Sequence, residues 1–153
     1  MKPELIRVDK ESELPEWADR DAVAAFFNQT MVPYHDTFED VQSALDYLFS
    51  DAKGEGGFLV LAREDDRLVG ALAMLRTGMK GYVPGWILLF VTVDPSMRGK
   101  GLGRQIIEYS LEQCDGPVKL HVEYDNPAKR LYERLGFTSK YAEMRYDPDA
   151  KSG

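Results

Sequence analysis

Residues 86–93, Trp-Ile-Leu-Leu-Phe-Val-Thr-Val, constrain the fold of this 153-residue chain more than any other segment. The run carries no charge and is closed by Asp94-Pro95. A strand buried on both faces has a nearly continuous apolar sequence, whereas a half-exposed strand alternates apolar and polar residues. The run therefore predicts a central strand in a sheet that is covered on both faces.

The rest of the chain predicts strands and helices arranged around that central strand. Apolar residues repeat with a period of two in strands and about 3.6 in helices. The expected order is a strand at 5–8, a helix at 13–29, a helix that begins near Thr37, a hairpin of strands at 58–63 and 68–75, the central strand, a helix from 102 to 114, a strand at 118–123, a helix from Asn126-Pro127 to Gly136, and a strand at 140–146. This order predicts a single α/β domain (α+β in some schemes) with a mixed sheet and helices on both faces. Residues 1–146 form the expected domain, and residues 147–153 form an expected mobile tail.

Composition limits the classes of partner. A net charge of −7 and a pI near 4.9 argue against a nucleic-acid binder, which needs a basic face. An amine-bearing partner suits this charge better, although the charge can also serve solubility alone. No apolar run approaches the roughly 20 residues of a membrane span. Residues 1–4 lack a secretory pattern, and Cys114 is the single cysteine, so a soluble cytoplasmic protein with Cys114 as a packing residue is expected.

A glycine-rich turn stands between the central strand and the next helix. Three glycines fall within five residues, and three cations surround them: Arg98, Gly99, Lys100, Gly101, Leu102, Gly103 and Arg104. Free amides and the helix dipole make such a turn an anion site. The dinucleotide fingerprint fails because Arg104 stands three residues after Gly101, and the P-loop fails because no Lys-Ser or Lys-Thr follows. The alternative is a turn that is glycine-rich only for tight packing.

Two segments resemble signatures of the GCN5-related N-acetyltransferases (GNAT). Residues 91–103 contain the R-x-x-G-x-G pattern after a buried strand, and residues 126–137 match N-x-A-x-x-x-Y-x-x-x-G-F. Together the two motifs and their flanking strands cover residues 86–146. The resemblance implies a mostly antiparallel sheet whose central strands splay apart. It also implies an N-acetyltransferase that uses acetyl-coenzyme A as co-substrate and needs no metal.

The resemblance assigns a set of residues to acetyl-coenzyme A. The amides of residues 99–103 are expected to hold the pyrophosphate, and the backbone of the central strand to pair with the pantetheine arm. On the second motif, Asn126 is expected to cap its helix, to bind the pantetheine amide, or both. Ala128 is small enough to give the cofactor room, and Lys129 is expected to reach its phosphates. The expected contacts are Val91, Val93, Arg98, Gly99, Lys100, Gly101, Leu102, Gly103, Arg104, Asn126, Ala128 and Lys129.

Tyr132 is the expected catalytic residue, because the matching tyrosine of the family protonates the departing thiolate. Its alternative role is that of a half-buried helix aromatic. The expected reaction is direct attack by a neutral amine in a ternary complex, with an amide such as that of Val91 stabilising the oxyanion. The general base stays open among Glu123, His35, His121 and water, because the central strand carries no carboxylate.

The acceptor and the assembly stay open as well. The acceptor is a small-molecule or a peptide amine, and residues 30–37 and 78–86 are expected to select it. Tyr34, Tyr82 and Trp86 either line that pocket or pack in the ordinary way. The use of acyl groups longer than acetyl is undecided, and the family resemblance favours a homodimer. No nucleic-acid or membrane partner is expected. The alternative function is a non-catalytic acyl-coenzyme A sensor or partner-binding module on the same fold.

Overall fold

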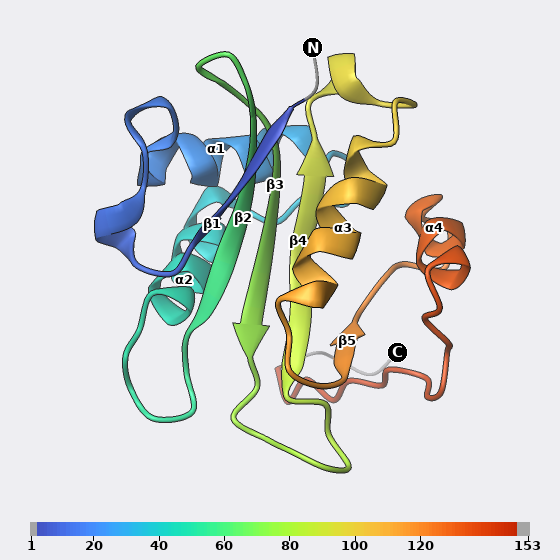
Figure 1. The fold of residues 1–153 in the computed structure, drawn as a ribbon. Coiled ribbons are helices and arrows are strands. Elements are labelled where there is room, and N and C mark those ends of the chain that lie inside the picture. Colours follow the sequence, from blue (N-terminus) through green and yellow to red (C-terminus); the bar gives the residue numbers. More distant parts are fainter. Residues whose placement is uncertain (1–2, 150–153) are drawn as a thin grey trace. The chain divides into compact units, whose positions relative to one another are not determined.

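A five-stranded sheet organises residues 3–120 of the computed structural model, which describes residues 3–149 (Figure 1). The chain divides into two compact units, Met1–Leu120 and His121–Gly153, and each is described by itself. The first unit contains β1 (Glu4–Val8), α1 (Arg20–Thr30), α2 (Phe38–Leu48), β2 (Gly57–Glu64), β3 (Arg67–Arg76), β4 (Trp86–Val93), α3 (Leu102–Glu112) and β5 (Val118–Leu120). The second unit contains α4 (Ala128–Arg134).

The sheet has the strand order β1-β2-β3-β4-β5 and is mostly antiparallel. Strands β1 to β4 pair antiparallel, and β2 and β3 form a hairpin in which Leu61 lies opposite Ala71. Strand β5 pairs parallel with β4, and α3 is the connection between them. A parallel pair needs such a crossover connection. The predicted mixed sheet is therefore confirmed.

Helices cover both faces of this sheet, with α1 and α2 on one face and α3 on the other (Figure 1). The core under α1 and α2 includes Phe27, Leu45 and Phe90. Successive side chains of a strand point to opposite faces, so Leu72 and Met74, which are fully buried, belong to the α3 face. Strand β4 contacts α1 and α3, so both of its faces are covered as its apolar sequence predicts, although its last three residues are only half-buried.

The predicted helix at 13–29 is wrong in its first part. Two short 3₁₀ helices, η1 (Glu11–Glu13) and η2 (Glu16–Ala18), precede α1. The backbone is extended at Pro15 and again at Asp19, whose carboxylate accepts a hydrogen bond from the Ala22 amide at 2.8 Å. Proline lacks an amide and aspartate caps helices, so both residues favour separate elements over one continuous helix.

Helix α2 begins where the sequence predicts. The Thr37 hydroxyl accepts a hydrogen bond from the Asp40 amide at 3.1 Å, and it satisfies one of the free amides of the first turn. The predicted cap at Thr37 is confirmed.

The predicted strands near the C-terminus are corrected. Strand β5 has three residues and ends at Leu120, not at Glu123. Residues 140–146 form no strand in the described structure, and Tyr141, Met144 and Tyr146 are exposed. Apolar alternation specifies a strand only when one face is buried, and here the alternation buries neither face. Of the predicted tail, residues 150–153 lie outside the described residues.

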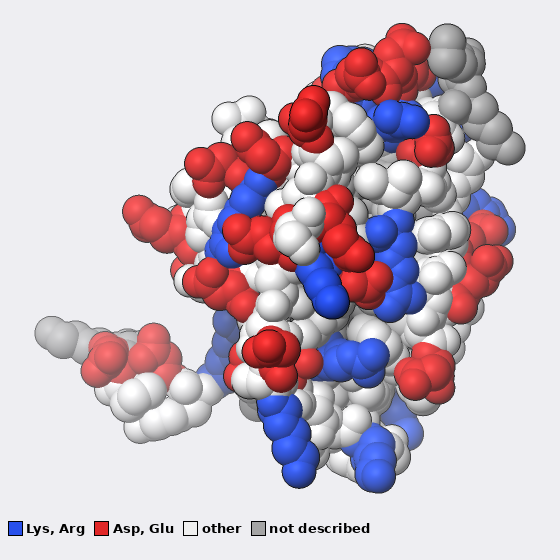
Figure 2. Space-filling view, turned by 60° about the vertical axis from the view of Figure 1, so that its left-hand side comes forward, with Lys and Arg blue, Asp and Glu red and all other residues white. Residues whose placement is uncertain are grey.

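Acidic side chains are spread over the face drawn in Figure 2, with basic side chains between them. Because both signs alternate, this face offers no continuous basic stripe for nucleic acid. Within residues 3–149, every helix is too short or too polar to cross a membrane.

Candidate active site

The glycine turn is anchored at the end of β4 by a short 3₁₀ helix, η3 (Pro95–Met97). The Asp94 carboxylate accepts hydrogen bonds from the amide and the hydroxyl of Ser96, at 2.9 and 2.7 Å. These bonds, helped by the charges of Arg67 and Arg98, lower the pKa of Asp94. An ionised Asp94 therefore fixes the chain direction just before the turn.

The turn itself has the shape of an anion cradle. Gly99 and Gly101 have φ angles of 78° and 82°, in the left-handed region that favours glycine. A Cβ atom added at Gly99, Gly101 or Gly103 would meet no atom of the described residues within 4 Å, so open space faces the backbone at all three. Gly101 is the N-cap of α3, and the Leu102 side chain is buried. The free amides of the first helical turn fit a phosphate group in that space.

The outer edge of β4 is unpaired beyond Leu88 in the described structure, because the ladder with β5 joins only Trp86, Ile87 and Leu88. The Asp94 amide donates to the Val69 carbonyl at 2.8 Å. Inter-strand bonding alternates along an antiparallel pair, so the backbone groups of Val91 and Val93 face away from β3. The two residues expected to pair with the pantetheine arm thus present their polar backbone at an open edge.

Arg98 has a role that the sequence does not reveal. Its guanidinium donates to the Thr30 carbonyl at the end of α1, at 2.8 Å. The Thr92 hydroxyl of β4 donates to the Thr30 hydroxyl at 2.9 Å. Thr30 therefore ties the end of α1 to strand β4 and to the glycine turn. The Arg104 guanidinium, by contrast, pairs with Glu108 on its own helix.

We expect Arg98→Gln to lower the free energy of unfolding by about 1 kcal/mol, because it removes a cation from the C-terminal end of α1. Urea denaturation measures the change. Arg104→Gln is the matched control, since an exposed i,i+4 pair contributes less than about 0.5 kcal/mol. Equal stabilities of the two variants would contradict the bracing role of Arg98.

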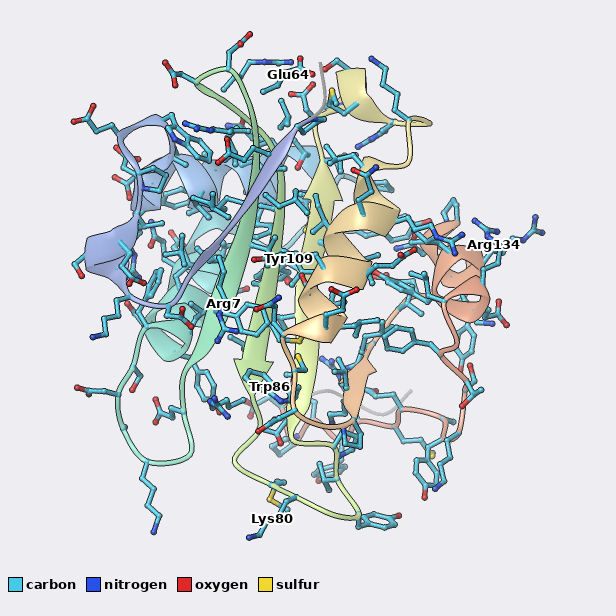
Figure 3. All side chains as sticks on the ribbon, in the orientation of Figure 1. Arg7, Glu64, Lys80, Trp86, Tyr109 and Arg134 are labelled. Atoms are coloured by element: carbon cyan, nitrogen blue, oxygen red, sulfur yellow. The ribbon has the colours of Figure 1, made fainter. Side chains whose placement is uncertain are left out.

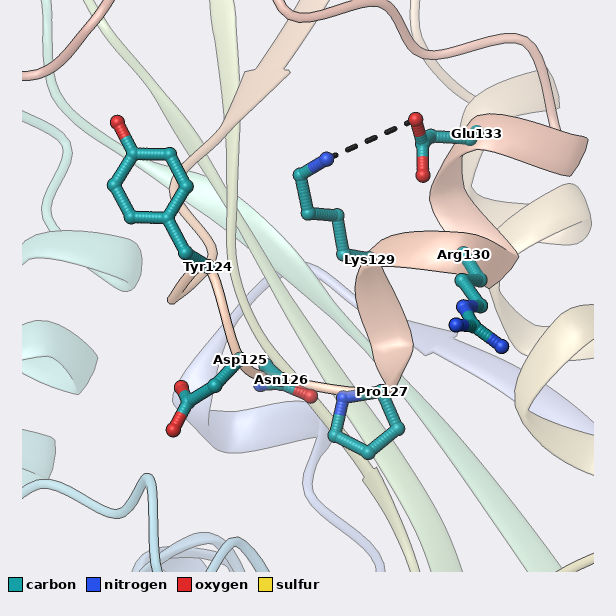
Figure 4. A pocket seen from close by; sticks show the side chains of 7 residues that line it. All are labelled: Tyr124, Asp125, Asn126, Pro127, Lys129, Arg130 and Glu133. Carbon is teal, nitrogen blue, oxygen red and sulfur yellow. Dashed lines mark ion pairs between the residues drawn. The ribbon is translucent and has the colours of Figure 1, made fainter.

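In the second unit, Asn126 caps the start of α4. Its side-chain oxygen accepts from the Ala128 amide at 2.9 Å, and its side-chain nitrogen donates to the Glu123 carboxylate at 3.4 Å. The capping role considered for Asn126 is confirmed. A pocket of about 490 Å³ lies beside it, lined by Asn126 and Lys129 among others, and Lys129 pairs with Glu133 at 3.7 Å (Figure 4).

Tyr132 is buried, and its ring packs edge-on against Phe137 with 5.7 Å between the ring centroids. Burial, together with the charge of Glu123, raises the pKa of Tyr132 to about 12. The phenol is therefore neutral at physiological pH and able to donate a hydrogen bond. The raised pKa keeps the proton on Tyr132 but makes the phenol a weak acid, so hydrogen-bond donation is the property that suits a role beside a departing thiolate.

The raised pKa of Tyr132 predicts a loss of stability at alkaline pH. Folding favours the neutral phenol, so this contribution is complete below the ordinary pKa of 10 and is lost as the pH rises through about 12. We expect wild type to lose about 2 kcal/mol more than Tyr132→Phe between about pH 9 and pH 11.5. Chemical denaturation of both proteins at pH 9 and pH 11.5 measures the difference, and parallel losses would contradict the burial of an ionisable phenol.

The structure assigns no general base. His35 is exposed in the first unit, and His121 and Glu123 are exposed in the second. Because β5 ends at Leu120, His121 and Glu123 do not share a strand face as the sequence predicts. The contact of Glu123 with Asn126 shows that this carboxylate helps to position the start of α4.

The three aromatic residues considered for the acceptor pocket differ in exposure. Trp86 is only 3% exposed, and its indole nitrogen donates to Asp115 at 2.9 Å, a contact that the sequence does not reveal. Tyr82 is 82% exposed. Tyr34 is half-buried. Only Trp86 lines a pocket found in the first unit.

Cys114 agrees with its expected packing role. Its thiol is half-buried and lies 3.5 Å from the Ser110 carbonyl, and burial raises its pKa to about 11. A thiol with so high a pKa is a poor nucleophile at neutral pH. Across residues 3–149, no three His, Cys, Asp or Glu side chains gather as metal ligands.

Comparison with known proteins shows which family the chain resembles. The sequence model of the acetyltransferase (GNAT) family matches residues 14–137. A mycothiol acetyltransferase of Catenulispora acidiphila is 43% identical over 61 residues, which cover 37% of this chain and 19% of that protein. The peptidyl-lysine N-acetyltransferase YjaB of Salmonella typhimurium is 26% identical over 114 residues, which cover 74% of this chain and 72% of that protein.

Among solved structures, an aminoglycoside N-acetyltransferase in complex with CoA has the same fold. The two structures superpose with a TM-score of 0.66 over 98% of both chains, at 13% sequence identity. The chain spans only 19% to 36% of the length of the mycothiol acetyltransferases that it matches. The family match, however, covers most of the chain, including the glycine turn and the helix of Tyr132. This chain therefore belongs to the GNAT acetyltransferase family.

Proposed function

We propose that this chain is an N-acetyltransferase that moves an acetyl group from acetyl-coenzyme A to a primary amine. The observation that carries the proposal is the glycine turn, where open space faces two left-handed glycines directly after an unpaired strand edge. Relatives named for acetylation of peptidyl-lysine and of aminoglycosides support an amine as acceptor. We infer that both units belong to one domain, since the family match crosses their boundary at Leu120.

The chain's own groups divide the work of holding acetyl-coenzyme A. We assign the pyrophosphate to the amides of residues 99–103, with Lys100 and Arg104 adding positive charge. We assign the amides of the pantetheine arm to the backbone of Val91 and Val93. Arg98 contributes through its backbone, because its side chain braces α1. Asn126, Ala128 and Lys129 are assigned to the same ligand in the second unit.

The proposed reaction needs one proton donor and one proton acceptor. Acetyl-coenzyme A, when bound, supplies a thioester whose C–S bond breaks as the amine nitrogen forms the new C–N bond. The Tyr132 phenol donates a proton toward the departing sulfur, and the amide of Val91 donates to the carbonyl oxygen as charge develops there. The amine loses its proton to water or to a base among Glu123, His121 and His35. No side chain of the protein forms a covalent bond in this scheme.

A release assay for free coenzyme A thiol tests the proposal. The chain is mixed with acetyl-coenzyme A and, in separate reactions, with polyamines, aminoglycosides, amino acids and lysine-containing peptides. We expect thiol release with at least one amine class, together with a product that carries one added acetyl group by mass spectrometry. Acetyl-coenzyme A that binds but is never consumed would instead favour the non-catalytic acyl-coenzyme A sensor.

A further inference from the structure

A second pocket, of about 440 Å³, lies where β4 begins, at the end of that strand opposite the glycine turn. It is formed by the connection from α2 to β2 at Gly54, the connection from β3 to β4, and residues 115–117 after α3. Figure 3 labels Trp86 and Lys80, two of its lining residues, at this end of the sheet. All of its lining residues belong to the first unit.

One wall of this pocket is an arginine held on an aromatic ring. The Arg76 guanidinium lies 4.3 Å from the centre of the Trp86 ring. Trp86 is fixed in turn by its hydrogen bond to Asp115 and by an edge contact with Phe58, whose ring centre is 5.5 Å away. A cation over an immobile indole is attracted to that face of the ring. The guanidinium therefore has a fixed platform beneath it.

The backbone of Arg76 is held as firmly as its side chain. Its amide donates to the Gly56 carbonyl at 2.8 Å, and its carbonyl accepts from the Tyr47 hydroxyl at 2.6 Å. The connection from β3 to β4 is closed by its own bonds, because the Thr77 hydroxyl donates to the Pro84 carbonyl at 2.7 Å. The pocket wall around Arg76 is thus ordered before any ligand arrives.

The hydrogen-bond donors of Arg76 are nevertheless unused. Each of the other six arginines in residues 3–120 directs its guanidinium to a carboxylate or a carbonyl: Arg7, Arg20, Arg63, Arg67, Arg98 and Arg104. The Arg76 guanidinium makes no hydrogen bond or ion pair within the part of the chain that the structure describes. A guanidinium has five N–H donors, and its planar fork matches a carboxylate or a phosphate.

The charges around the pocket favour an anion. Arg76 and Lys80 are its cationic lining residues, and Asp115 is its acidic one. The hydrogen bond from Trp86 lowers the pKa of Asp115, and the nearby charge of Arg76 lowers it further, so this carboxylate offsets part of the positive charge of Arg76. With two cations and one carboxylate, the charged lining residues leave one net positive charge in a chain with a net charge of −7.

We propose that this pocket binds the carboxylate or phosphate group of a small ligand, through the guanidinium of Arg76 and the ammonium of Lys80. The stacked guanidinium loses little freedom when it binds, which favours affinity. This site is separate from the acetyl-coenzyme A site, because the glycine turn lies at the far end of β4. Its existence does not depend on acetyl transfer.

The tryptophan in the wall provides the readout. The chain has two tryptophans, so Trp17→Phe leaves Trp86 as the single indole. Nuclear magnetic resonance then follows the indole N–H of Trp86 while inorganic phosphate or succinate is added at constant ionic strength. We expect a saturable shift with at least one of the two probes, and the tighter probe identifies the preferred anionic group.

Three variants in the Trp17→Phe background sharpen the test. Arg76→Gln should weaken binding about tenfold or more, because it removes the charged donor. Arg76→Lys should weaken it less, because it keeps the charge without the planar fork. Lys53→Gln is the matched control, because Lys53 is exposed in the connection from α2 to β2 but does not line the pocket. It should leave affinity unchanged within about twofold.

Two results would overturn the proposal. One is the lack of a saturable shift with either probe, and the other is equal weakening by Lys53→Gln and Arg76→Gln. Thermal denaturation without ligand checks that each variant is folded. If Arg76→Gln does not fold, Arg76→Lys alone still tests the site. Because no acetyl-coenzyme A is present, a negative result here leaves the acetyltransferase proposal unaffected.

Discussion

Gly101→Glu should lower the affinity for acetyl-coenzyme A by at least about 100-fold, because a like charge placed against an anion costs several kcal/mol. Gly101 has a φ of 82° and caps α3, so a side chain there projects from the floor of the proposed pyrophosphate site. Among residues 3–149, no atom lies within 4 Å of a Cβ placed at Gly101, so a side chain there has open space before it. Isothermal titration calorimetry measures the affinity.

Gly101→Ala separates backbone strain from charge. Alanine carries the same left-handed strain, about 1 kcal/mol, but adds no negative charge and little bulk. We expect its affinity to lie between those of wild type and Gly101→Glu. Normal binding of acetyl-coenzyme A by Gly101→Glu would show that the pyrophosphate lies elsewhere, whereas equal loss in both variants would point to a distorted turn.

Tyr132→Phe should slow turnover about 100-fold while leaving the dissociation constant for acetyl-coenzyme A nearly unchanged. Proton donation typically contributes 10²- to 10⁴-fold to a rate. We expect the lower end because the pKa of Tyr132, about 12, lies well above that of an ordinary thiol, about 8.5. A phenol so much weaker than the thiol assists the departing sulfur mainly by hydrogen bonding during C–S cleavage.

Tyr146→Phe is the control for this prediction, because Tyr146 is exposed in the same unit. It should leave kcat and KM unchanged. Steady-state kinetics with the best amine from the thiol-release assay gives both constants for each variant. Unaltered kcat in Tyr132→Phe would rule out the donor role and leave Tyr132 as an aromatic that packs on Phe137.

Local signals in the sequence predict most of the first unit. The uncharged run at 86–93 is β4, with the predicted bounds, and Thr37 caps α2 as its position before an amphipathic segment indicates. Both signals act over a few residues, so they need no knowledge of distant contacts. The first part of the helix predicted at 13–29 is wrong because the breaks at Pro15 and Asp19 prevail over the periodic apolar residues there.

The strand predicted at 140–146 fails for a different reason. Period-two alternation is present, but whether such a segment pairs depends on a partner strand and a buried face, which no local pattern specifies. The structure exposes Tyr141, Met144 and Tyr146 instead.

The candidate site is predictable in its backbone and not in its side-chain contacts. The glycine pattern gives the left-handed turn at Gly99 and Gly101, because only a local conformation is involved. The bond from Arg98 to Thr30 joins residues 68 positions apart, and the stack of Arg76 on Trp86 needs the pairing of β3 with β4. Such contacts follow from the tertiary fold, so they emerge only once the sheet is assembled.

Thermal unfolding of the wild-type chain with increasing acetyl-coenzyme A tests whether this member of the family binds the cofactor at all. A ligand at 100 times its dissociation constant stabilises the folded state by about 2.7 kcal/mol, which raises the unfolding midpoint of a chain of this size by about 5–10 °C. The proposed function predicts a rise of that order, abolished in Gly101→Glu. A midpoint that stays constant up to millimolar acetyl-coenzyme A would contradict it.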